Sequence, residues 1–135
     1  MTKVKCSYLG DLNCEAIHLQ SGSILKTDAP LDHFGKGESF SPTDLLATSL
    51  GSCLLTIMAI KAKSKGFDLE GIYLHIEKIM TQNSERKIKE LIIDIFIPKS
   101  TSNEIIDFLK IASEDCPVTR NLSQEIDIKI SWHNK

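Results

Sequence analysis

The stretch SPTDLLATSLGSCLLTIMAIKAKSKG, residues 41–66, decides how the chain is organised. Ser41 is a favourable N-cap, Pro42 suits the first helical position, and Asp44 stands three residues after the cap, as in a capping box. Lysines and a glycine close the stretch, which indicates a helix end. Because residues 45–60 carry no charge and are apolar almost all round, we expect a helix that is enclosed on most sides.

Short strand-like runs precede this helix, at 3–9, 14–20 and 23–27, and the brief turns between them predict an antiparallel meander. A polar loop at 28–40, with prolines and glycines, joins the meander to the helix. We expect this loop to lie in solvent or to line a site.

Hydrophobic alternation follows the helix at 71–80 and 88–97, which predicts a long hairpin. A second helix starts near residue 101 or 102, and a short turn or helix follows at 116–122. A last strand alternates apolar residues inward: Ile126, Ile128, Ile130 and Trp132. The order β-β-β-α-β-β-α-β predicts an α+β fold, a largely antiparallel sheet packed on helices, in a single domain, 1–135.

The length of the chain, its charge and its apolar segments limit the functions that we expect of it. A chain of 135 residues can bury a core. Its net charge of -2 and scattered basic residues argue against nucleic acid as a partner. The N-terminal stretch has no secretory pattern, and the uncharged stretch 45–60 is shorter than a membrane span requires. We therefore expect no membrane partner and a cytoplasmic protein whose thiols are kept reduced.

The four cysteines are Cys6, Cys14, Cys53 and Cys116. In a reducing compartment they are not a structural disulfide framework. None of them forms a C-x-x-C pair and the histidines are dispersed, so we expect no metal site.

Cys53 lies inside the uncharged helix, and two interpretations remain open. Free cysteine is often buried as a small apolar filler. The helix dipole does not activate this thiol, which lies about 16 Å from the positive end of the helix at 1.5 Å per residue. A reactive Cys53 therefore needs a cation or hydrogen-bond donors from another part of the structure.

Cys116 stands at a helix entry, beside the cap, with Pro117 in the first turn. Unpaired backbone N–H groups there favour a thiolate, whereas Glu114 and Asp115 oppose one. The alternative is a turn cysteine without a chemical role.

Two motifs resemble those of the OsmC/Ohr family. SPTDLL at 41–46, followed by GSC at 51–53, resembles its SP-x-(E/D)-LL…GSC helix, and CPVTRNL at 116–122 resembles its CPVS-x-x-L segment. The resemblance covers nearly all of the chain. It implies an intertwined homodimer with a curved sheet, the cysteine helices at its centre, and two sites at the subunit interface. No metal, flavin or haem cofactor is implied.

The same resemblance implies the chemistry. Cys53 would attack a hydroperoxide and become a sulfenic acid, and Cys116 would condense with it to a disulfide that an external dithiol reduces. Apolar surroundings of Cys53 would favour organic hydroperoxides. The expected role is oxidative-stress defence, and Cys53 is expected to titrate below the ordinary cysteine value.

Departures from the family pattern concern the groups that activate the thiol. Ohr-type members carry a glutamate where Thr43 stands and an arginine in the N-terminal strands, whereas no arginine occurs here before Arg86. Asp44 matches an acidic position of OsmC-like relatives, and its other role is capping. Arg86, at the hairpin turn, would lower the pKa of Cys53 if the dimer brought it close, and is otherwise an exposed turn charge.

His33 and Glu38 of the 28–40 loop are candidates for lining a pocket.

Two other functions compete with peroxide reduction. The missing Ohr-type groups favour an OsmC-fold protein that binds a small apolar ligand with little peroxidase activity. A protein–protein adaptor would need a large exposed apolar patch, and nothing in the sequence points to one.

Overall fold

The computed structural model describes residues 1–135, which form two compact units, Met1–Leu46 and Ala47–Lys135. The prediction that the whole chain is a single domain stays a prediction. Each unit contains one three-stranded sheet.

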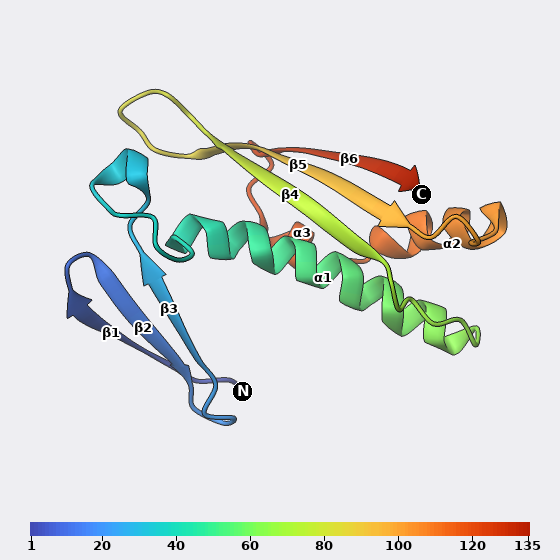
Figure 1. Ribbon diagram of the computed structural model, residues 1–135, viewed down its shortest axis with the longest axis horizontal. Helices are drawn as coiled ribbons and strands as arrows, with labels where there is room; N and C mark the ends of the chain where they lie inside the picture. Colours follow the sequence, from blue (N-terminus) through green and yellow to red (C-terminus); the bar gives the residue numbers. More distant parts are fainter. The chain divides into compact units, whose positions relative to one another are not determined.

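The first unit is the expected antiparallel meander. Its strands are β1 (Val4–Gly10), β2 (Asn13–His18) and β3 (Ile24–Asp28), in the order β1-β2-β3 (Figure 1). A single 3-10 turn, η1 (Leu31–His33), interrupts the loop that follows. The prediction of three strands and a loop is therefore confirmed, with strand ends that differ by up to two residues.

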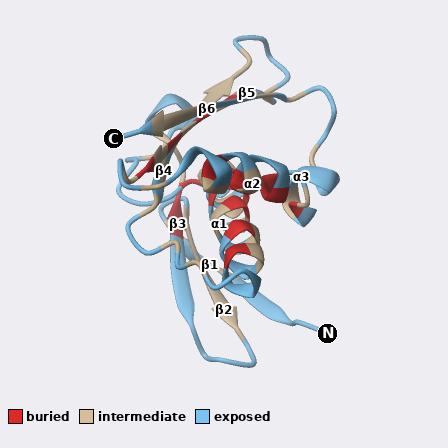
Figure 2. Cartoon of the chain, turned by 90° about the vertical axis from the view of Figure 1, so that its right-hand side faces the viewer, coloured by how far each residue is buried: buried red, intermediate tan, exposed pale blue.

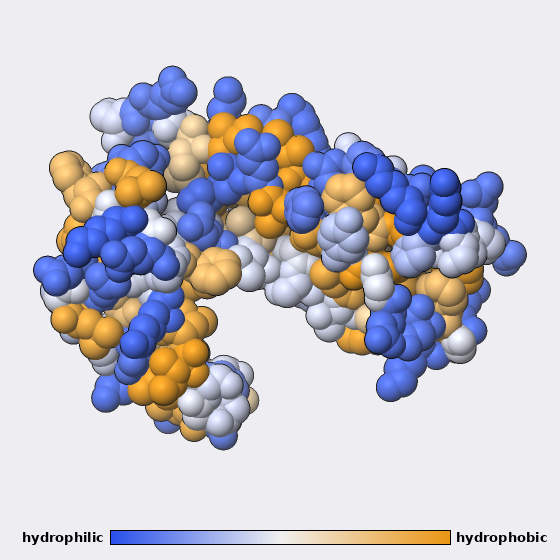
Figure 3. All heavy atoms as spheres, viewed as in Figure 1, coloured by the Kyte–Doolittle hydropathy of each residue, from blue (hydrophilic) through white to orange (hydrophobic).

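Apolar side chains remain at the surface of the first unit. Within the chain the exposed ones on the three strands include Val4, Tyr8, Leu9, Ile24 and Leu25. Figure 3 shows orange, apolar atoms gathered over these strands. The small sheet therefore has little core of its own.

Helix α1 (Pro42–Ser64) begins with the predicted capping box. The N–H of Ser41 donates to Asp44 Oδ2 at 2.9 Å, and the N–H of Asp44 donates to Ser41 Oγ at 3.1 Å. These reciprocal bonds satisfy two backbone donors that a helix start otherwise leaves unpaired.

The expectation that α1 is enclosed on most sides is wrong for the single chain. Its buried residues form one stripe at helical spacing: Ala47, Leu50, Gly51, Leu54, Met58 and Ala62. By length and composition alone α1 could cross a membrane, although a helix of a soluble core meets the same criterion. The chain itself covers only one face of this apolar helix.

The second unit packs helices on one face of a sheet. Strands β4 (Tyr73–Met80) and β5 (Ile88–Ile97) are antiparallel, and β6 (Asp127–Asn134) pairs with β5 in parallel. Helices α2 (Asn103–Ser113) and α3 (Pro117–Asn121) lie on the same side of this sheet as α1 (Figures 1 and 2). The α+β class and the element order are confirmed, with α3 added.

The core of the second unit lies between α1, α2 and β5. Its completely buried members are Leu50, Met58, Ala62, Leu91, Ile93, Ile95, Leu109 and Cys116. Helix and sheet approach closely at Gly51, where an added Cβ would lie 3.0 Å from Leu74 Cδ1. This packing fixes the height at which Cys53 stands above the sheet.

Candidate thiol site

Two cysteines from different helices meet in the second unit. Cys53 lies on α1 and is partly exposed, whereas Cys116 is completely buried and is the N-cap of α3. Pro117 occupies the first turn of α3, as the sequence predicts. The two thiols lie close enough to influence each other's ionisation, and neither is in a disulfide.

The two thiols have pKa values shifted in opposite directions. Burial raises the pKa of Cys53, and the hydrogen bond and charge of Cys116 raise it further, against a smaller lowering by the N–H of Val118. Burial also opposes ionisation of Cys116, but the Cys53 thiol, the Thr119 hydroxyl and nearby backbone N–H groups outweigh it and lower its pKa. Cys116 is therefore the more acidic thiol of the pair, and its sulfur is the first of the two to ionise.

The raised pKa of Cys53 contradicts the expectation that its pKa lies below the ordinary cysteine value. At the start of α3 the N–H groups of Val118 and Thr119 both lower the pKa of Cys116, whereas only that of Val118 acts on Cys53, which stands far along α1. The thiol nearer to solvent is therefore the weaker acid of the two.

A hollow of about 420 Å³ opens beside Cys53. Its walls are Ser49, Ser52, Cys53, Thr56, Ile57, Ile60, Pro117 and Val118. A small molecule in this hollow meets the sulfur of Cys53, while Cys116 lies buried behind it. The site thus offers one accessible thiol and one enclosed thiol that is the more acidic of the two.

Sequence reasoning missed Thr119, whose hydroxyl stabilises the Cys116 thiolate. Its position three residues after an N-cap cysteine is a signal that could have identified it, since N-cap side chains interact with that position. The sequence indicates Asp115 only as a charge that opposes a thiolate, whereas in the structure it forms ion pairs with Lys61 and Arg120.

The other candidate residues lie elsewhere in the chain. Asp44 is engaged in the capping box of α1. His33 closes η1 with its ring 5.3 Å from that of Phe34, and the N–H of Glu38 donates to Asp28 Oδ2 at 3.1 Å. Both belong to the first unit.

Arg86 lies in the turn between β4 and β5 and is partly buried. It is not among the groups that shift the pKa of Cys53 within one chain. No group of three or more His, Cys, Asp or Glu side chains is arranged to hold a metal ion.

Comparison with known proteins places this chain in a family. The sequence model of the OsmC-like proteins matches residues 35–131, which is more than half of the chain. No curated protein matches. The chain belongs to the OsmC-like family, and the resemblance drawn from its motifs is confirmed.

Solved structures of other proteins match the fold of this chain over nearly its whole length. A protein of Psychrobacter arcticus assigned to osmotic stress and detoxification responses is 41% identical, with a TM-score of 0.91, over 98% of this chain and 96% of that one. The organic hydroperoxide resistance protein OsmC of Legionella pneumophila is 19% identical, with a TM-score of 0.73, over 98% and 96%. One assigned to organic hydroperoxide resistance in Vibrio cholerae, with captopril bound in one of its active sites, is 15% identical, with a TM-score of 0.77, over 100% and 92%. At such low identities the last two show the fold alone.

Proposed function

We propose that this protein reduces organic hydroperoxides through Cys53 and Cys116. The observation that carries the proposal is the pairing of an accessible thiol with a buried, more acidic thiol beside one hollow. Membership of a family that includes organic hydroperoxide resistance proteins supports it.

In the first step the sulfur of Cys53 attacks the distal peroxide oxygen and the O–O bond breaks. In the form of the site in which Cys116 is ionised, the proton of Cys53 passes to the neighbouring Cys116 thiolate and from there to the departing alkoxide. The products are an alcohol and the Cys53 sulfenic acid, and Cys116 is again a thiolate. Cys116 therefore acts as a proton acceptor before it acts as a nucleophile.

In the second step the Cys116 thiolate attacks the sulfur of the Cys53 sulfenic acid. The S–O bond breaks, hydroxide leaves and takes up a proton, and a disulfide forms. An external dithiol then reduces this disulfide by thiol–disulfide exchange, which restores both thiols.

The apolar walls of the hollow favour organic hydroperoxides over hydrogen peroxide. Ile57, Ile60 and Val118 offer hydrocarbon surface close to Cys53. Each CH₂ group of a substrate that is buried there contributes about 0.8 kcal/mol.

The protein acts as a homodimer in this proposal. Support comes from the apolar residues left exposed on β1–β3 and from the uncovered face of α1, because soluble chains seldom leave such surfaces in water. A cytoplasmic location fits chemistry that starts from two reduced thiols.

Stopped-flow oxidation of the reduced protein tests the proposal. Cumene hydroperoxide should oxidise Cys53 faster than hydrogen peroxide does, and the Cys53→Ser variant should not turn over. Slow reaction of the wild type that does not depend on Cys53 would contradict it.

A second candidate is a protein that binds small apolar ligands, favoured by the raised pKa of Cys53, because a protonated thiol is a poor nucleophile. Cumyl alcohol, which is the product of cumene hydroperoxide reduction and cannot oxidise a thiol, separates the two. If it raises the melting temperature while cumene hydroperoxide leaves Cys53 reduced, binding is the function.

A further inference from the structure

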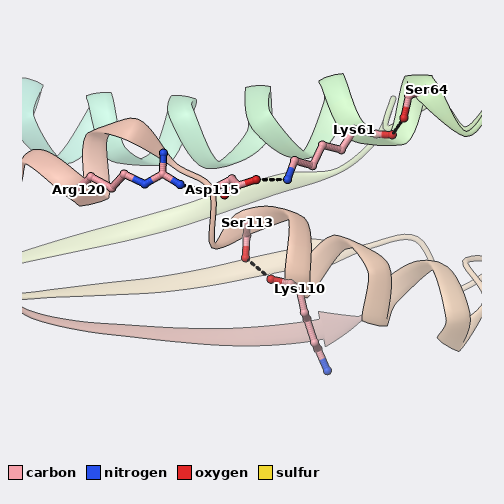
Figure 4. Close-up of polar contacts among 6 residues, drawn as sticks. All are labelled: Lys61, Ser64, Lys110, Ser113, Asp115 and Arg120. Atoms are coloured by element: carbon pink, nitrogen blue, oxygen red, sulfur yellow. Dashed lines mark hydrogen bonds and ion pairs between the residues drawn. The ribbon is translucent and has the colours of Figure 1, made fainter.

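Asp115 links the two helices that carry the cysteines. It immediately precedes Cys116 in the turn between α2 and α3. Its Oδ2 accepts a hydrogen bond from Lys61 Nζ of α1, and its Oδ1 accepts one from Arg120 of α3 at 2.9 Å (Figure 4). One carboxylate thus joins α1, the Cys116 turn and α3.

These contacts hold the carboxylate in its charged form. The hydrogen bond and charge of Lys61, followed by those of Arg120, lower the pKa of Asp115. The side chains are partly exposed, 36% for Lys61 and 49% for Asp115. Exposed ion pairs add little to global stability and weaken in salt, so this network affects local position more than folding.

The location of the network bears on the distance between the two sulfurs. Lys61 lies on the same helix as Cys53, about 12 Å further along at 1.5 Å per residue. A disulfide requires the sulfurs to approach to about 2.05 Å. Closure therefore requires the Cys116 turn and α1 to stay close together, and the residue beside Cys116 is tied to α1.

We propose that Lys61, Asp115 and Arg120 form a clamp, here named the Asp115 clamp, that holds Cys116 in position to close a disulfide on Cys53. All three are positioning residues, since none of them touches the reacting sulfurs. The inference deepens the proposed function, but disulfide closure itself can be measured with any thiol-specific oxidant.

Glutathione measures this closure without a peroxide. Cys53 first exchanges with glutathione disulfide, forming a mixed disulfide and releasing one glutathione thiolate. The Cys116 thiolate then attacks Cys53, the Cys53–glutathione bond breaks, and a second glutathione thiolate leaves. The equilibrium position gives the effective concentration of Cys116 toward Cys53.

The experiment uses the full chain with Cys6→Ser and Cys14→Ser, so that Cys53 and Cys116 are the only cysteines that can react with glutathione. Asp115→Asn and Lys61→Gln should each lower the effective concentration of Cys116 by about tenfold, because a small misplacement of a reacting group makes its reaction much less favourable. The matched controls are Glu114→Gln, beside Asp115, and Lys63→Gln, on the same helix as Lys61. Both controls should keep the parent value.

Two further readouts separate position from folding. High salt should lower the effective concentration of the parent toward that of Asp115→Asn and leave that variant unchanged. Formation of the first mixed disulfide at Cys53 should keep its rate, since only closure needs the clamp. Lys61→Arg, which retains the charge, should stay closer to the parent than Lys61→Gln does.

If the effective concentration is unchanged in both Asp115→Asn and Lys61→Gln, the proposal that the clamp positions Cys116 is wrong. A fall equal to that of the control variants overturns it as well. If these variants behave as expected but hydroperoxides leave Cys53 reduced, the clamp stands and the proposed peroxidase function fails.

Discussion

Cys53 of α1 and Cys116 at the start of α3 interact through their thiols, and this contact shifts their pKa values apart. The buried sulfur has its pKa lowered and the accessible sulfur has its pKa raised. Because the two groups share one site, their protons are released in two coupled steps. The pair should therefore respond as a unit when either member is changed.

Removing Cys116 should make Cys53 more acidic. Two of the influences that raise the pKa of Cys53, a hydrogen bond and a charge, come from Cys116, and only burial remains in Cys116→Ala. Thiolate ultraviolet absorbance against pH, with Cys6 and Cys14 replaced by Ser, measures this. A Cys53 pKa that rises or stays constant in Cys116→Ala would show that the contact has been misassigned.

Thr119→Val should raise the pKa of Cys116. The substitution keeps the branched shape and removes the hydroxyl that stabilises the thiolate. Thr119→Ser retains a hydroxyl and is the matched control, so its Cys116 should titrate like the wild type. Equal titration curves for the valine and serine variants would exclude a role for the hydroxyl.

The local features of this fold were predictable, and the contacts between distant segments were not. The capping box of Ser41 and Asp44 and the alternation in β5 follow from residues a few positions apart. The parallel pairing of β6 with β5 depends on a long crossover that sequence periodicity does not specify.

In the candidate site, too, the local motifs were predictable from the sequence and the contacts between distant residues were not. The motifs indicated Cys53 and Cys116, but the order of their pKa values depends on which N–H groups lie near each sulfur in three dimensions. The contact between Lys61 and Asp115 joins residues far apart in sequence. No spacing rule relates them.

The close approach of α1 to the sheet predicts that Gly51→Val destabilises the protein by about 1–3 kcal/mol, the usual range for overpacking. An added Cβ would already lie 3.0 Å from Leu74 Cδ1, and a branched side chain needs more room. Chemical denaturation measures the loss, with Ser52→Ala, an exposed neighbour on α1, as the control. A stability equal to that of the control would mean that the interface is looser than described.

The Asp115 clamp should be lost in acid. Because the pKa of Asp115 is lowered in the folded chain, its contribution to stability is complete above the ordinary aspartate pKa and disappears as pH falls through the lowered value. The difference in unfolding free energy between wild type and Asp115→Asn, which is small because the ion pairs are exposed, should therefore shrink with acidification. A difference that stays constant into strong acid would indicate that the carboxylate charge is not involved.

Substrate preference should follow the apolar walls of the hollow. Across straight-chain alkyl hydroperoxides, kcat/KM should rise by up to about fourfold for each added CH₂ that is buried. Ile60→Asn should flatten this dependence, since Ile60 lines the hollow, whereas Ile111→Asn, at an exposed position outside it, should not. A preference independent of chain length in the wild type would rule out the hollow as the alkyl site.

Mass mapping of the linked cysteines tests the central claim most directly. The reduced wild-type protein is treated with one equivalent of cumene hydroperoxide, alkylated and digested. We predict a single disulfide per chain, between the peptides that contain Cys53 and Cys116, with Cys6 and Cys14 alkylated. Full alkylation of Cys53 and Cys116 after oxidant treatment, or a linkage through other cysteines, would contradict the account.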